Sequence, residues 1–229
     1  MSDILATDFF VNFNKIIIPA IGASVRMLFF SMLFGIIIGT AVAVFLAYTS
    51  PYGLNPKPRL YAAVGFVVNM IRSFPVIILI LAVSPLTRAL VGTSVGEKAA
   101  IFPLTLAAFP VIARYMETSL LEVDPDVVLA ARSFGASNIQ IMFKVLFTEA
   151  FPSIISGMTT TTILFLASTA LAGAVGAGGL GAVALTYGYQ RFDDVMMYGI
   201  VVILFVMVLF IQGLGGLLYK WARSKPLRK

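Results

Sequence analysis

The sequence predicts an all-α membrane protein with five transmembrane helices, and three observations lead to this fold class. Of the 229 residues, 60% are hydrophobic and only 11% are charged, whereas a soluble domain carries about 25% charged residues. The mean hydropathy is +1.01. The apolar residues also lie in long runs, and about 20 of them suffice to cross the hydrocarbon core of a bilayer. We therefore expect residues 1–229 to form a single membrane domain, without a soluble second domain.

Five apolar runs are long enough to span a membrane. They lie at about 26–48, 61–83, 99–121, 153–175 and 195–219. The N-terminus does not resemble a cleaved signal peptide, because it lacks a basic region and its first charged residues are Asp3 and Asp8. We therefore expect the first span to be retained.

The distribution of basic residues predicts the orientation. The net charge is +6, and five of the sixteen basic residues lie in the last ten positions: Lys220, Arg223, Lys225, Arg228 and Lys229. Basic segments next to membrane spans stay in the cytoplasm, so the charge indicates a cytoplasmic C-terminus rather than a nucleic-acid site. An odd number of spans then places the N-terminus outside the cell. Lys57 and Arg59 of the first loop, and Arg132 and Lys144 of the third, agree with this topology.

The chain contains no cysteine and no histidine. Thiolate nucleophiles, disulfides, histidine-based triads and Cys/His zinc sites are therefore excluded. An intramembrane enzyme would need such a nucleophile with a base, or a metal site. We therefore expect no catalytic residue and no bound metal in this chain.

Polar residues interrupt the second span at Arg72, Ser73 and Pro75. An arginine near the bilayer centre costs about 2.5–3.5 kcal/mol on insertion scales, and proline removes a main-chain donor and kinks a helix. We expect an irregular turn that faces a cavity. The alternative is structural, with Arg72 paired to a neighbour or bonded to carbonyls that the kink frees.

Two further spans carry polar side chains. Arg114 and Glu117 are three residues apart in the third span and can form a structural ion pair on one helix face. In the fourth span, Thr159 to Thr162 can bond back to carbonyls one turn earlier. Ser168 and Thr169, followed by the bulky Leu171, are candidates for a pathway lining with an apolar constriction.

Glycine-rich stretches suggest close packing rather than nucleotide binding. The segment GAGGLG at 176–181 matches G-x-G-x-x-G, but no strand precedes it and no βαβ unit fits here. We interpret it as an unwound turn that permits tight packing. The stretch GTSVGEK at 92–98 lacks the Gly-Lys-Ser/Thr of a phosphate-binding loop. Gly35 and Gly39 form a small-residue helix contact, either within the chain or between subunits.

A pair of short helices is predicted between spans three and four, at about 124–148. Asp124 is a suitable N-cap, Pro125 suits the first helical position, and Asp126 complements the helix dipole. Val127, Ala130, Ala131 and Phe134 form an apolar stripe at helical spacing. Gly135 then ends the helix, and Ser137 with Gln140 forms a capping box for the next one.

Two interpretations of this helix pair remain open. An amphipathic hairpin on the lipid surface would favour a polar face rich in Lys and Arg, and this one has only Arg132 and Lys144. The other interpretation is a docking element for a cytoplasmic partner.

The segment LAARSFGASNIQIMFKVLF at 129–147 resembles the EAA motif of ABC-importer permeases, with Ala130, Ala131 and Gly135 in the motif's positions. The stretches NMIRSFPVIILI, VGTSVGEKAAIFPLTLAAFPVIAR and GAVGAGGLG extend the resemblance to permeases of the D/L-methionine uptake transporter family. Amino-acid permeases of this kind carry a similar Arg-x-x-Pro in the second span, so the resemblance implies that Arg72, Ser73 and Pro75 face the translocation pathway. Leu129 departs from the motif, because it stands where the family has glutamate. Phe147 and Thr148 stand where the family often has Leu-Pro, so the second helix is expected to run on.

The resemblance implies a permease subunit of an ATP-driven importer that moves methionine across a bacterial cell membrane by alternating access. Its expected partners are two ATP-binding-cassette subunits, which hold ATP and Mg, an extracytoplasmic methionine-binding lipoprotein, and a second copy of this chain. The residues expected to dock on the ATPase are Asp126, Ala130, Ala131, Arg132, Gly135, Ala136 and Ser137. Another small amino acid is an alternative substrate. An ion-coupled secondary transporter is an alternative mechanism, for which Glu117 is the only strong intramembrane carboxylate.

Overall fold

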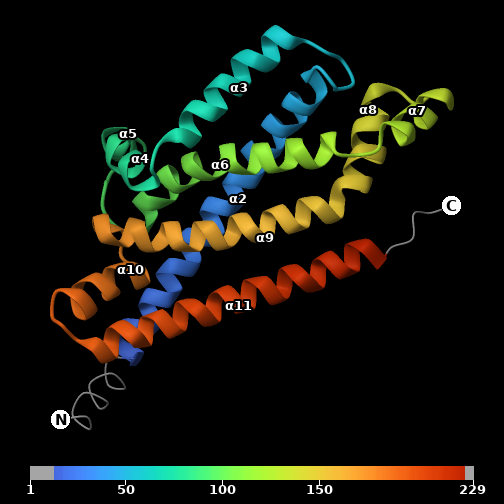
Figure 1. The fold of residues 1–229 in the computed structure, drawn as a ribbon. Coiled ribbons are helices and arrows are strands. Elements are labelled where there is room, and N and C mark those ends of the chain that lie inside the picture. Colours follow the sequence, from blue (N-terminus) through green and yellow to red (C-terminus); the bar gives the residue numbers. More distant parts are fainter. Residues whose placement is uncertain (1–12, 225–229) are drawn as a thin grey trace. The chain divides into compact units, whose positions relative to one another are not determined.

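A computed structural model describes residues 13–224 (Figure 1). Asp3 and Asp8 of the N-terminal segment, and Lys225, Arg228 and Lys229 of the basic tail, lie outside the described residues. Within 13–224 all regular secondary structure is helical and no strand is present, as expected for an all-α membrane protein.

The longest helices coincide with the apolar runs. The α-helices are α2 (Ile18–Thr49), α3 (Pro58–Ser73), α4 (Val76–Ala82), α5 (Ser84–Val91), α6 (Glu97–Leu121), α7 (Pro125–Ser133), α8 (Asn138–Gln140), α9 (Phe147–Ala172), α10 (Gly179–Val183) and α11 (Asp194–Ser224). Short π-helical turns precede α2, join α8 to α9, and flank α10 at Phe13–Ile17, Ile141–Leu146, Gly173–Ala177 and Ala184–Tyr189.

Among residues 13–224, four helical segments are long and apolar enough to cross a membrane, and a bent pair brings the number to five. The four are Phe13–Thr49, Glu97–Leu121, Asn138–Ala177 and Asp194–Ser224. The pair is α3 with α4, which bends by 99° at the break. The expected five spans are thus obtained when this pair counts as one, and the chain is a multi-pass membrane protein.

The break in the second span occurs at the predicted proline. Helix α3 ends at Ser73 and α4 begins at Val76, with Pro75 as its N-cap at φ −55° and ψ 133°. Because proline has no N–H to donate, α3 cannot continue through this position with its hydrogen bonds intact. The expected irregular turn is therefore present.

The fourth span extends further than its apolar run. Helical structure is continuous from Asn138 to Ala172, with Pro152 inside the helix, and Val175 and Gly176 then leave helical geometry. The sequence suggested that the docking helix ends near 148 and the span starts near 153. No break separates them, because Phe147 and Thr148 both continue the helix, and Thr148 Oγ1 donates to the carbonyl of Lys144 at 2.9 Å.

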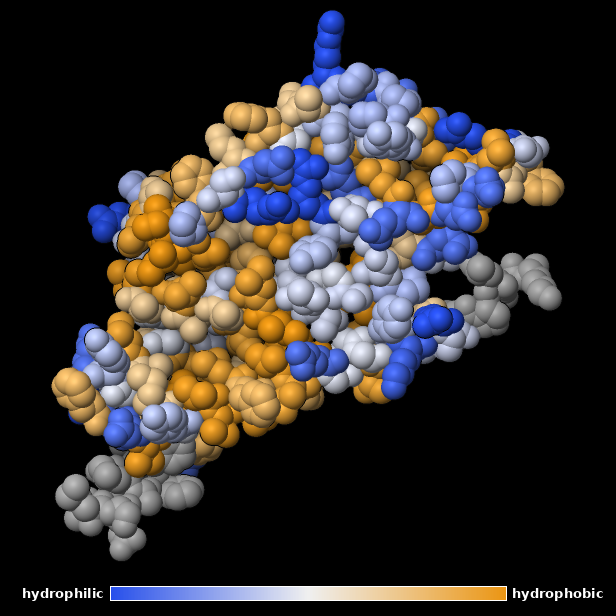
Figure 2. All heavy atoms as spheres, viewed as in Figure 1, coloured by the Kyte–Doolittle hydropathy of each residue, from blue (hydrophilic) through white to orange (hydrophobic). Residues whose placement is uncertain are grey.

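The described chain forms two compact units. Unit 1 comprises residues 13–33, 74–107 and 162–211, and unit 2 comprises residues 34–73, 108–161 and 212–224. Hydrophobic side chains cover much of the visible face of the molecule (Figure 2). In the most apolar stretch of α11 only 11% of residues are buried within the chain, so this helix presents its side chains to lipid or to another subunit.

In unit 1 the unwound glycine turn packs against α2. Gly176, Gly178 and Gly179 have positive φ values of 96°, 83° and 74°, which residues with a side chain rarely adopt. The next residue, Leu180, donates its N–H to Ser24 Oγ at 2.9 Å. A Cβ on Gly179 would lie 2.6 Å from the same oxygen. The prediction of an unwound packing turn is confirmed.

In unit 2 the small residues of α2 pack against α6. A Cβ on Gly35 would lie 2.9 Å from Ala108 Cβ, and one on Gly39 would lie 2.7 Å from Ile112 Cγ2. The Gly35–Gly39 contact is therefore made within the chain.

Candidate functional site: an exposed helix pair

Helix α7 is capped as its sequence predicts. Asp124 Oδ1 accepts a hydrogen bond from the Asp126 N–H at 2.9 Å, and Pro125 occupies the first turn. Such an N-cap is worth about 1 kcal/mol to a helix. Gly135 follows the helix with φ 79°, so the chain turns where a side chain would be strained.

Helix α8 begins with the predicted capping box. The Gln140 N–H donates to Ser137 Oγ at 3.3 Å, and the Ser137 N–H donates to Gln140 Oε1 at 2.9 Å. Both ends of the connection between α7 and α8 are therefore fixed by local hydrogen bonds. The helix pair is a defined element and not a loose loop.

Helices α7 and α8 keep their apolar side chains uncovered, whereas Ile141, Met142 and Leu146 beyond α8 are buried. No residue of α7 is buried, and Phe134, Ile139 and Leu129 are 91%, 69% and 63% exposed. Three further side chains of the predicted stripe, those of Val127, Ala130 and Ala131, are exposed or half-buried. The other predicted docking residues are exposed or half-buried as well: Asp126, Arg132, Gly135, Ala136 and Ser137.

One main-chain oxygen connects the helix pair to the first loop. The carbonyl of Leu54 accepts from Arg132 Nη2 at 3.4 Å and from Asn138 Nδ2 at 3.3 Å. No motif in the sequence predicts this contact. The sequence does predict a structured turn at residues 50–57, because Pro, Gly and Asn are concentrated there.

A groove of about 380 Å³ lies beside this contact, in unit 2. Its walls come from helix α7, from the C-terminal ends of α2 and α6, from the 50–57 loop, and from the π-helical turn Ile141–Leu146. Most lining residues are apolar, including Leu54, Leu120 and Leu129, and the charged ones are Asp126 and Arg132.

The predicted ion pair in α6 is present and reaches a second helix. Arg114 Nη1 lies 2.8 Å from Glu117 Oε2, and the Glu117 residue is 3% exposed. Arg114 also donates to the Gly65 carbonyl at 3.0 Å and to Asn69 Oδ1 at 3.2 Å, both on α3. The network therefore ties α6 to α3 within unit 2, which the sequence spacing alone did not show.

The six predicted pathway residues fall into exposed and buried groups. Arg72, Ser73 and Pro75 are exposed at the end of α3 and in the break, and Leu171 is 46% exposed on α9. Ser168 and Thr169 are 4% and 1% exposed, and their hydroxyls donate to the carbonyls of Leu164 and Leu166. These two side chains are thus covered by the chain itself.

The neighbouring threonines behave as expected. The hydroxyls of Thr159, Thr160 and Thr161 donate to carbonyls four residues earlier, at 2.8, 3.2 and 2.8 Å. These bonds satisfy the hydroxyls within the helix.

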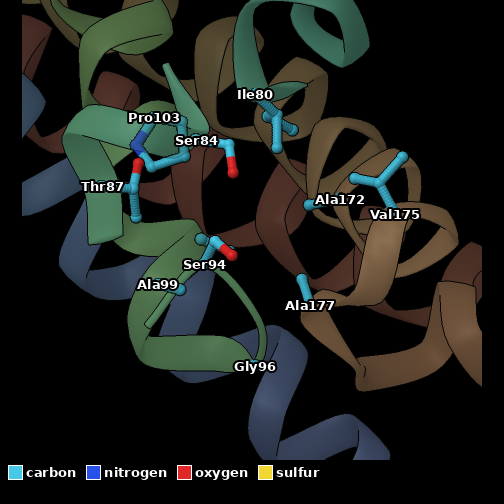
Figure 3. A pocket seen from close by; sticks show the side chains of 11 residues that line it. Ile80, Ser84, Thr87, Ser94, Gly96, Ala99, Pro103, Ala172, Val175 and Ala177 are labelled. Carbon is cyan, nitrogen blue, oxygen red and sulfur yellow. The ribbon is translucent and has the colours of Figure 1, made fainter. Parts of the chain in front are cut away.

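A small cavity in unit 1 lies where the two glycine loops meet (Figure 3). The Gly96 N–H donates to the Gly176 carbonyl at 2.9 Å, and Ser84, Thr87 and Ser94 supply polar groups to the lining. The volume is about 10 Å³, which suits a single water molecule. The cavity is too small for an amino acid.

The chain is similar in sequence and in fold to membrane components of transport systems. Residues 35–224 match the family described as "Binding-protein-dependent transport system inner membrane component". The probable D-methionine transport system permease protein MetI of Vibrio cholerae serotype O1 is 44% identical over 81% of this chain and 83% of its own length. The methionine import system permease protein MetP of Bacillus subtilis is 40% identical over 76% and 78%, respectively. In a solved structure of the MetNI methionine ABC transporter in an inward-facing conformation, one chain superimposes with a TM-score of 0.88 and 39% identity, covering 91% of this chain and 96% of that one.

Proposed function

Because the chain belongs to the family of binding-protein-dependent transport system inner membrane components, we propose that it is the permease subunit of an ATP-driven importer for D- and L-methionine. The observation that carries this proposal is the exposed helix pair α7–α8. It is capped at both ends of its connection, yet none of α7 is buried. A rigid apolar surface of this kind is typical of a protein–protein interface.

The partner proposed for this surface is an ATP-binding-cassette subunit. Ala130, Ala131 and Ala136 let another surface approach closely, while Phe134 and Ile139 project by 91% and 69% of their area. Apolar side chains that project from a rigid element are suited to filling a groove on a partner. Exposed Asp126, Arg132 and Ser137 would form the polar rim around them.

We propose a bacterial cell-membrane location, with the N-terminus outside and the C-terminus and helix pair in the cytoplasm. The basic residues near the end of α11, Lys220 and Arg223, support this orientation. The ATPase would then reach α7–α8 from the same compartment that holds ATP and Mg. ATP hydrolysis belongs to that partner, and an extracytoplasmic binding lipoprotein would deliver methionine from the other side.

The proposed assembly contains two copies of this chain and two ATPase subunits. The four or five spans of the described chain are few for enclosing a solute path, and only 11% of the most apolar stretch of α11 is buried. A pathway between two permease subunits accommodates both observations. Closure of the ATPases would push on both helix pairs and switch the spans between outward and inward access.

For the translocation pathway we propose the exposed candidates Arg72, Ser73, Pro75 and Leu171. An arginine with a hydroxyl suits the carboxylate of an amino acid, and an apolar side chain suits the thioether of methionine. Ser168 and Thr169 would act indirectly, because their side chains are buried and bonded to the main chain.

Ion coupling is the less favoured mechanism. The intramembrane carboxylate that it would use, Glu117, is paired with Arg114 at 2.8 Å. A group that must bind and release a proton or cation in each cycle is poorly served by a permanent positive partner. Uptake should therefore resist a protonophore when ATP is maintained.

The test is a mild-detergent pull-down of the tagged chain from its native membranes, followed by methionine uptake in cells. We expect a stoichiometric ATP-binding-cassette protein with the wild type and its loss with Ala131→Asp. Gly135→Val should lower uptake while membrane insertion is unchanged, because φ 79° disfavours a β-branched residue. Wild-type uptake in either variant, or no ATPase with the wild-type chain, would refute the docking assignment. Competition by D- and L-methionine against other amino acids tests the substrate.

A further inference from the structure

The loop between α2 and α3 is a compact turn that folds back on α2. The N–H groups of Asn55 and Lys57 donate to carbonyls in the last turn of α2 at 2.9 Å each. The Leu54 side chain is 8% exposed, so it anchors the turn. A Cβ on Gly53 would collide with the main-chain oxygens of Ala47 and Tyr48. The segment 50–57 therefore has a defined structure, which sets the direction of its carbonyls.

Two side chains from different parts of the helix pair converge on one of these carbonyls. Arg132 lies in the last turn of α7 and Asn138 is the first residue of α8, and both donate to the Leu54 oxygen. A carbonyl oxygen has two lone pairs and so accepts both bonds. The turn between the helices, which contains Gly135, lies between the two donors in the sequence. The Leu54 carbonyl therefore bridges the two arms of the helix pair.

A groove between the loop and α7 lies beside the hydrogen bonds to Leu54. The groove of about 380 Å³ is lined by Tyr52 and Gly53 from the loop and by Asp126 and Leu129 from α7. In the described part of the chain, segment 50–57 accepts hydrogen bonds from the helix pair at the Leu54 carbonyl. The hydrogen bonds between the loop and the helix pair are thus concentrated at the end of α7 and the start of α8, while both helices also pack against the π-helical turn Ile141–Leu146.

We propose that segment 50–57 is a brace that holds α7 and α8 in their relative orientation, with Asn138 and Arg132 as positioning residues. The inference rests on the proposed function, in which the helix pair transmits motion from the ATPase to the spans. Motion reaches the spans efficiently only when α7 and α8 move together. Without the brace, α7 would pivot about the Gly135 turn, and part of each ATP-driven movement would be lost.

The test uses Asn138→Asp in the complete transporter, reconstituted in liposomes with its ATPase and binding protein. Aspartate has the size of asparagine and suits the first turn of a helix, but its carboxylate cannot donate to Leu54. We expect the ATP hydrolysed per methionine transported to rise about twofold to tenfold, as for loss of one hydrogen bond. Assembly and melting temperature should stay at wild-type values.

Ser133→Ala is the matched control. It removes the bond from Ser133 Oγ to the Leu129 carbonyl on the same helix pair and leaves the Leu54 contact intact. A wild-type ratio for this control, with a raised ratio for Asn138→Asp, supports the brace. A wild-type ratio for Asn138→Asp in an assembled transporter overturns it and leaves the proposed function standing.

Hydrogen exchange on the chain alone gives a readout that does not depend on transport. Asn138→Asp should speed amide exchange across 125–137 relative to Ser133→Ala, because α7 is then free to pivot. Equal exchange in the two variants would refute the brace even if no ATPase binds. Failure of the wild-type chain to bind an ATPase would instead refute the proposed function.

Discussion

Replacing Arg114 with methionine should destabilise the chain more than any single change on its surface. The substitution leaves the Glu117 carboxylate, 3% exposed, without the cation that lies 2.8 Å away. It also removes the donor to the Gly65 carbonyl and to Asn69 Oδ1. Breaking a buried pair by removing one partner costs about 3–5 kcal/mol. We expect a loss of that size in the free energy of unfolding.

The matched double variant Arg114→Met/Glu117→Leu should recover much of this loss. Replacing both members with apolar residues leaves no buried charge, and such replacements are often neutral. The expected coupling energy between the two sites is about 2 kcal/mol or more. The measurement is ellipticity at 222 nm during unfolding in mixed detergent micelles, for the wild type, both single variants and the double variant.

Strict additivity would contradict this reasoning. If the double variant loses as much stability as the sum of the two single variants, the pair contributes nothing through its mutual interaction. Glu117→Gln is a useful third variant, because glutamine keeps an acceptor for Arg114 and should cost less than Glu117→Leu alone.

Three further predictions concern other contacts. Gly39→Leu should lower the melting temperature, because even the leucine Cβ would lie 2.7 Å from Ile112 Cγ2. Such overpacking costs about 1–3 kcal/mol of stability. An unchanged melting temperature would exclude the close contact. Ser24→Ala should destabilise unit 1 by about 1–3 kcal/mol, because the buried Leu180 N–H loses its acceptor, and proteolysis of the folded chain would detect this. Leu129→Glu restores the motif's carboxylate on an exposed position and should retain or strengthen ATPase capture in the pull-down, whereas loss of capture would show that leucine is itself a contact.

Local features of the helix pair could be predicted from the sequence because each depends on a few adjacent residues. The Asp124 cap, the Gly135 turn and the Ser137–Gln140 box all form within one helical turn. The Arg114–Glu117 pair belongs to the same class, since its members are three residues apart.

Contacts between distant segments could not be predicted in the same way. Arg132 and Asn138 are 78 and 84 residues from Leu54, and their acceptor is a main-chain oxygen that every residue type possesses. The burial of Ser168 and Thr169 depends on which helices surround α9, and helical periodicity alone does not say which face is covered. The continuity of α8 with α9 depends on residues 141–148, where neither Gly nor Pro interrupts the helix.

The two kinds of glycine contact impose different limits on how this sequence can evolve. The three heavy atoms nearest a Cβ on Gly215 all belong to the side chain of Thr159, so a side chain at 215 can be offset by glycine at 159, and the two positions can change together. Gly173 and Gly181 face main-chain atoms, including the Ala182 nitrogen and the Ala170 carbonyl. No second substitution removes a main-chain atom. These two glycines therefore have no compensating partner, and every viable descendant of this chain that retains the turn must retain them.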